Sequence, residues 1–119
     1  MSFAKRFNKG QSFNIDTRDY NYVKMSELYA KEGADTVHKV DGMFLHQGKL
    51  GMQPVFIDIE HKSLVNAPAY LCDTVKEILN DEEAVNAIKA GKVGYTIREY
   101  ESHGKKCYAV NWVDIEQLW

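Results

Sequence analysis

Histidine and cysteine are the side chains of this sequence that could bind a metal or transfer protons. The sequence holds four histidines and two cysteines, namely His38, His46, His61, His103, Cys72 and Cys107. No histidine has the close spacing to another histidine or to a cysteine that metal-binding motifs use. The phosphate-binding loop, the G-x-S-x-G nucleophile turn and the H-E-x-x-H helix are also missing from the sequence. The sequence therefore predicts no catalytic residue, no metal site and no cofactor, and an enzyme such as a small nuclease is the minor alternative.

Cations and aromatic rings are more informative, because single-stranded nucleic acid is bound by cations on its phosphates and by exposed rings on its bases. Each stacked ring contributes about 1–3 kcal/mol. In the stretch 54–59, Phe56 alternates with Val55 and Ile57, so Phe56 faces outward if the other two fill the core. In the stretch 92–101, Tyr100 shares a face with Arg98.

The positions of these rings and cations predict a DNA-binding surface on strands and turns. Its members are Phe56, Arg98, Tyr100, Lys49, Lys39, Lys105, Lys106 and Tyr108. The alternative for each ring is ordinary core packing. A two-residue turn at His103 and Gly104 would pair Tyr108 with Glu99 and Trp112 with Tyr95. Core packing therefore fits Trp112, which would lie opposite another ring, better than it fits Tyr100.

Charge is distributed unevenly along the chain. Fifteen lysines and arginines stand against seventeen acids, so the net charge of -2 does not itself indicate a polyanion partner. Acids crowd residues 73–83, whereas many lysines fall in expected strands and turns. A basic surface on an acidic protein is the expectation.

The elements that must position these residues follow from hydrophobic spacing and turn signals. Residues 1–12 show neither the helical nor the strand spacing of hydrophobic residues, which predicts a flexible arm. Residues 13–119 are expected to form one domain. Within residues 13–35, an apolar stretch surrounds Tyr22, and Ser26 opens a helical turn that Gly33 ends. The expected strands are 36–46, 54–59, 61–65, 92–101 and 105–115, and short helices are expected over 68–79 and from Asp81 to Gly91.

The predicted fold is mainly β with one or two short helices. Five strands with a helix between strands 3 and 4 is the layout of an OB-fold, a five-stranded barrel that commonly binds oligonucleotides or oligosaccharides. A small SH3-like barrel and a split-sheet α+β domain are the alternative folds.

Several stretches resemble a known family. They are residues 13–20 (FNIDTRDY), 42–49 (GMFLHQGK), 64–68 (LVNAP), 73–78 (DTVKEI), 81–85 (DEEAV) and 90–94 (AGKVG). Together they are similar to the single-stranded DNA-binding proteins of phages that infect lactococci and related bacteria. The resemblance implies an OB-fold, sequence-tolerant binding of displaced strands during phage DNA replication and recombination, and assembly into a dimer or tetramer. It also implies phage recombination or replication proteins as partners, but no site residue.

The sequence also indicates a cellular compartment and leaves one main alternative function. The sequence shows no apolar run of about 20 residues and no signal-like start, which predicts a cytoplasmic protein, here in the host cell, with no membrane partner. The main alternative function is a protein-interaction module of a phage that acts on a host or phage replication factor.

Overall fold

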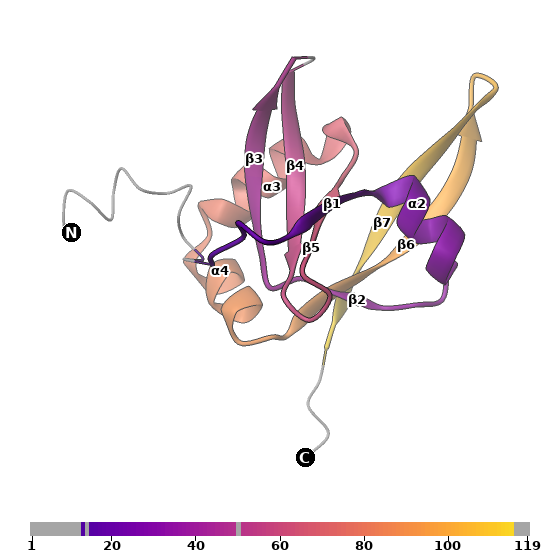
Figure 1. The fold of residues 1–119 in the computed structure, drawn as a ribbon. Coiled ribbons are helices and arrows are strands. Elements are labelled where there is room, and N and C mark those ends of the chain that lie inside the picture. The colour runs from indigo at the N-terminus through magenta and orange to yellow at the C-terminus, as the bar shows by residue number, and fades with distance from the viewer. Residues whose placement is uncertain (1–12, 14, 50, 116–119) are drawn as a thin grey trace.

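The computed structural model describes residue 13, residues 15–49 and residues 51–115. The expected arm of residues 1–12 lies outside the described residues. In chain order the elements are β1 (Asn21–Lys24), α2 (Met25–Glu32), β2 (His38–Lys39), β3 (Gly42–Gly48), β4 (Gly51–Asp58), β5 (Ser63–Asn66), the short 3-10 helix η2 (Ala69–Leu71), α3 (Cys72–Leu79), α4 (Glu82–Lys89), β6 (Val93–Ser102) and β7 (Lys105–Asp114) (Figure 1). The described chain is mainly β, as the sequence predicted, and its α-helices are short.

The strands form two sheets. β1, β5, β4 and β3 make a four-stranded sheet in that order, and β2, β6 and β7 make a three-stranded sheet. Within the first sheet, β3, β4 and β5 pair antiparallel in sequence order, whereas β1 pairs parallel with β5. Neither sheet closes into a barrel, so the expected OB-fold, a five-stranded barrel, is not confirmed.

One continuous run of chain joins the two sheets. The N–H of Val40 donates to the carbonyl of Val93, which begins β6, at 3.0 Å. The N–H of Asp41 donates to the carbonyl of Ile57 in β4, at 2.8 Å. The segment from β2 to β3 therefore starts in one sheet and ends in the other. Gly94 lets β2 approach β6 closely, because a Cβ at this position would lie 2.8 Å from the carbonyl oxygen of His38.

The core corrects the expected orientation of Phe56. This ring is 1% exposed and lies in the main core cluster, with its centroid 5.2 Å from that of Tyr95. Val55 and Ile57, on the other face of β4, are buried as well in a second cluster with Leu64. Both faces of β4 are thus covered, and alternation along this strand separates two cores instead of core from solvent.

The helices and one hairpin follow their local sequence signals. The Asp81 carboxylate accepts hydrogen bonds from the N–H groups of Glu83 and Ala84, which caps α4 close to the expected helix start. His103 and Gly104 both have positive φ, 53° and 76°, as a tight two-residue hairpin turn requires. The turn sets the register of β6 and β7, and Tyr108 pairs with Glu99 as expected.

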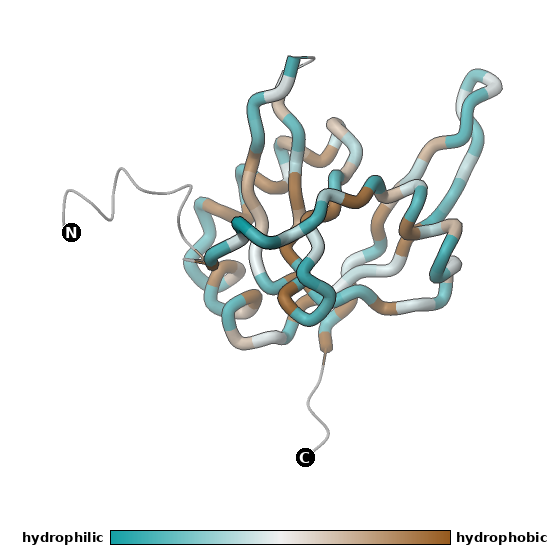
Figure 2. Tube along the Cα trace, in the orientation of Figure 1, coloured by the Kyte–Doolittle hydropathy of each residue, from teal (hydrophilic) through white to brown (hydrophobic). Residues whose placement is uncertain are grey.

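The two long hairpins, β3–β4 and β6–β7, project in the same direction from the body of the molecule (Figure 1). Their ends are hydrophilic, whereas hydrophobic residues gather where the sheets meet the helices (Figure 2). The hairpins therefore form two polar arms above a common core.

Candidate nucleic-acid interface

A cleft of about 840 Å³ lies beside the end of the β3–β4 hairpin. We call it the hairpin cleft. One wall comes from β3, β4 and their turn, and the opposite wall from β1, the start of α2 and Tyr108 of β7. The end of β5 and the start of η2 lie between these walls. The lining residues are Tyr22, Lys24, Met25, Ser26, His46, Gly48, Lys49, Gly51, Met52, Gln53, Asn66, Ala67, Pro68, Ala69 and Tyr108.

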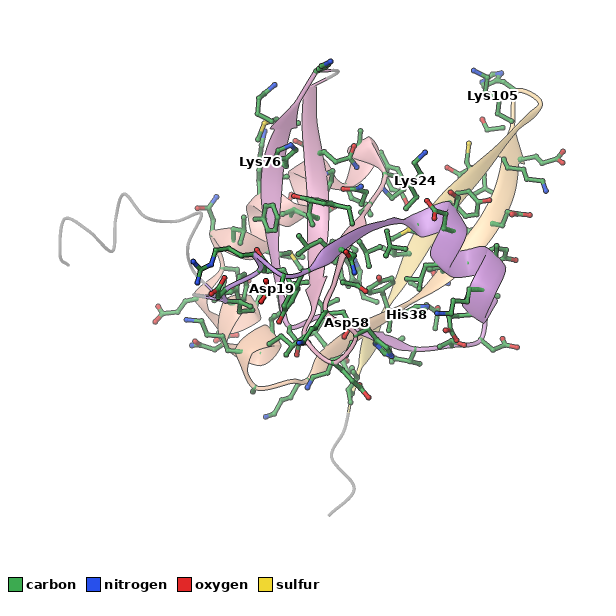
Figure 3. The ribbon with its side chains drawn as sticks, in the orientation of Figure 1. Asp19, Lys24, His38, Asp58, Lys76 and Lys105 are labelled. Carbon is green, nitrogen blue, oxygen red and sulfur yellow. The ribbon has the colours of Figure 1, made fainter. Side chains whose placement is uncertain are left out.

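The charge of the hairpin cleft is of one sign. Lys24 and Lys49 line it together with His46, and no described lining residue is an aspartate or a glutamate. Neither lysine forms an ion pair with a described residue. Figure 3 shows Lys24 between the two hairpins. On a chain of net charge -2, this is a local concentration of free positive charge.

Two tyrosines line the same cleft. Tyr22 of β1 is 55% exposed, which leaves its ring free to stack. Tyr108 is half-buried and lies 5.6 Å, centroid to centroid, from Tyr29 of α2. Its hydroxyl donates to Oε2 of Glu99 at 2.9 Å, and this hydrogen bond raises the pKa of Tyr108. Tyr108 is therefore held in place, while Tyr22 is the more accessible ring.

The β6–β7 hairpin also carries two exposed residues, Arg98 and Tyr100, on the face opposite to Tyr108. Register places Thr96, Arg98 and Tyr100 of β6 on one face with Asn111, Ala109 and Cys107 of β7. We call this the outer face, and it contains no carboxylate. The guanidinium of Arg98 lies over the ring of Tyr100, 5.5 Å from its centroid, and both side chains are exposed.

Tyr70 adds a ring near the outer face. It belongs to η2, is 55% exposed and hydrogen-bonds the backbone of Val110 in β7. Partial burial raises the pKa of Tyr70, whereas the hydrogen bond with Val110 and, to a smaller degree, the charge of Arg98 lower it. The rings of Tyr70 and Tyr100 therefore lie on or beside this hairpin together with Arg98, which has no carboxylate partner among the described residues.

The residues predicted from the sequence divide among these surfaces. Lys49 and Tyr108 meet in the hairpin cleft, whereas Arg98 and Tyr100 share the outer face. Lys105 and Lys106 are exposed beside the turn of the β6–β7 hairpin, and Figure 3 shows Lys105 at its end.

Two predicted residues lie on neither surface. Phe56 belongs to the core. Lys39 points to another part of the molecule, where its Nζ lies 3.4 Å from Oδ1 of Asp41.

Sequence reasoning missed four of the residues just described, Tyr22, Lys24, His46 and Tyr70. The alternation of Tyr22 and Lys24 about Val23 was a usable signal that both face one side of a strand. Tyr70 follows a helix-start proline, and nothing in its local sequence indicates a position beside β7.

Within residues 13, 15–49 and 51–115, no three His, Cys, Asp or Glu residues are placed to hold a metal ion. No helix in the same part of the chain has both the length and the apolar character needed to span a membrane. Comparison with protein-family models, with curated proteins and with solved structures gives no match for this chain.

Proposed function

We propose that this protein binds single-stranded DNA with little sequence preference and does no chemistry on it. The observation that carries the proposal is the hairpin cleft, in which Lys24, Lys49 and His46 face two tyrosines without any described carboxylate lining. A positively charged groove with stacking rings is the usual form of a single-strand site. The outer face, with Arg98 and Tyr100, supplies a second set of the same groups on the neighbouring hairpin.

In this proposal each group has one task. Lys24 and Lys49 neutralise phosphates, because both ammonium groups are free of ion pairs with described residues. Tyr22 and Tyr108 offer ring faces to bases, which is tolerant of sequence because every base has a π-face. The strand leaves the cleft past the turn of the β6–β7 hairpin, where Lys105 lies, and reaches Arg98 and Tyr100.

The fold supports the proposal through its resemblance to an opened OB layout. The meander β3–β4–β5, the helices α3 and α4 and the hairpin β6–β7 follow the OB order, and the segment from β2 to β3 takes part in both sheets. Closure would require β5 to pair with β7. Here β5 is paired on both sides, by β4 and by β1, so the edge is not available to β7.

The biological setting follows from the sequence resemblance and belongs to the same proposal. It is the protection of displaced strands during phage DNA replication and recombination, by a protein that assembles as a dimer or tetramer. Light scattering of the purified chain measures the subunit number directly.

Fluorescence anisotropy tests the binding. A labelled oligo-dT is titrated with protein at low and moderate salt, beside duplex DNA of the same length. We expect tight binding of the single strand, weakened by salt, and weak binding of the duplex. The absence of binding at low salt would refute the proposed function. Binding of the same strength at both salt concentrations would refute the phosphate contacts.

A further inference from the structure

A second pocket, of about 400 Å³, has the opposite charge to the hairpin cleft. We call it the acidic pocket. It lies between α2, β2 and the segment that joins β4 to β5, and four carboxylates line it. These are Glu27, Glu32, Asp58 and Glu60.

Two positive groups of the acidic pocket are already paired with carboxylates, and one of these carboxylates, Asp58, also lines the pocket. Lys39 is paired with Asp41, and the imidazole Nδ1 of His61 lies 2.7 Å from Oδ2 of Asp58. Lys31 is the remaining lysine of the described lining. The carboxylates of Glu27, Glu32 and Glu60 have no ion-pair partner among the described residues. The pocket therefore holds an excess of negative charge.

His38 supplies an independent observation. It lines the acidic pocket and is 8% exposed, and its Nε2 has no hydrogen-bond partner in the described structure. Burial lowers the pKa of His38, which favours the neutral imidazole, and the negative charges of Glu32 and Asp58 oppose this effect. A neutral imidazole has one nitrogen that accepts a hydrogen bond. The pocket thus combines carboxylates with an unused polar atom.

We propose that the acidic pocket binds an arginine side chain presented by a basic segment of a partner protein. A guanidinium carries five N–H donors in a plane, and it can bond two carboxylates and a further acceptor at once. Glu32 is an acceptor of this kind, and Asp58 has further lone pairs beside those that His61 uses. Nε2 of His38 accepts as well in the tautomer that carries its proton on Nδ1. Charge complementarity selects the occupant, since four carboxylates surround the space.

The acidic pocket is separate from the hairpin cleft, although both touch β1. Tyr22 and Lys24 line the cleft, whereas Val23 lines the acidic pocket. Successive side chains of a strand point to opposite sides, so β1 stands between the two sites. The inference is therefore independent of DNA binding, and either proposal can fail without the other.

The experiment is an NMR titration of the ¹⁵N-labelled full chain with the peptide acetyl-Gly-Arg-Gly-amide. The matched control peptide carries citrulline, which keeps the shape of arginine without its charge. We expect saturable shifts at the amides of His38, Glu32 and Asp58 and at the ring nitrogens of His38, with the arginine peptide only. Glu32→Gln and Asp58→Asn should each weaken binding about tenfold or more, the effect of losing one charge-assisted hydrogen bond.

Further arms separate this proposal from its rivals. Lys49→Gln, in the hairpin cleft, should leave the peptide affinity unchanged. Equal shifts with the citrulline peptide, or an affinity unaffected by both acidic-pocket variants, would overturn the proposal. So would saturable shifts at His38 with spermidine or with zinc chloride and none with the arginine peptide, because the occupant would then be a polyamine or a metal ion.

Discussion

Replacing the two cleft lysines should reduce the salt dependence of single-strand binding by a calculable amount. Each neutralised phosphate contributes about -0.7 to the slope of log affinity against log salt for a single strand. Lys24 and Lys49 are both free of ion pairs with described residues, so each is counted as one phosphate contact. Lys24→Gln and Lys49→Gln should each make the slope less negative by about 0.7, and the double variant by about 1.4.

The slope converts into affinities that anisotropy can resolve. A fourfold rise in salt, from about 50 to about 200 mM, weakens binding about 2.6-fold for each phosphate contact. The salt-induced loss of affinity should therefore be about sevenfold larger in the unmodified chain than in the double variant. Titrations of labelled oligo-dT at four or more salt concentrations give both slopes.

Lys76→Gln provides the matched control. It makes the same change of charge and side-chain length, but Lys76 is an exposed residue of α3 and does not line the hairpin cleft (Figure 3). Its slope should equal that of the unmodified chain. Equal slopes for the double variant and the unmodified chain would show that phosphates do not enter the cleft. Equal losses for all three single variants would show that only net charge matters.

Three further outcomes test the core, the buried imidazole and a helix end. Phe56→Ala should lower the free energy of unfolding in urea by about 3–5 kcal/mol, as truncation of a buried ring does, whereas Tyr100→Ala should change it by no more than about 0.5 kcal/mol; similar losses for both would contradict the assigned burial. The pKa of His38 is lowered by burial, so the unfolded chain takes up a proton near the ordinary value of 6.5 before the folded chain does, and stability should fall as pH drops below that value. His38→Gln should remove this dependence of the urea midpoint on pH. The pKa of His61 is raised by its hydrogen bond with Asp58, so His61 should stabilise the fold below pH 6.5 and lose this effect as pH rises through its folded pKa. His61→Gln should therefore lower the urea midpoint at low pH, where His38→Gln raises it relative to the midpoint at neutral pH. Asp81→Ala should cost about 1 kcal/mol through loss of the α4 cap, measured by the same urea titration, and an unchanged midpoint would mean that the cap is not stabilising in solution.

The features that the sequence predicted correctly depend on residues close together in the chain. The start of α4 needs only the Asp81 carboxylate and the N–H groups two and three residues later, and the turn at His103 and Gly104 determines the register of both its strands. The exposed pair Arg98 and Tyr100 follows from alternation on one strand of that hairpin. Local geometry is sufficient for each of these.

The features that were missed depend on distant parts of the chain. Alternation along β4 could not show that residues 15–20 cover one face while helices and β6 cover the other, and so it misplaced Phe56. The parallel pairing of β1 with β5 joins Tyr22 to Leu64, more than forty residues away. Lys24 reaches His46 and Lys49 only through such contacts.

The same pairing of β1 accounts for both candidate sites. By pairing with β5, β1 takes the edge that β7 would need for closure, so the two hairpins remain apart and a cleft is left beside them. Since its side chains alternate, β1 also contributes Tyr22 and Lys24 to the basic cleft and Val23 to the acidic pocket. The short strand β1 thus occupies one edge of β5 and separates the cleft that we propose for phosphates from the pocket that we propose for a cation.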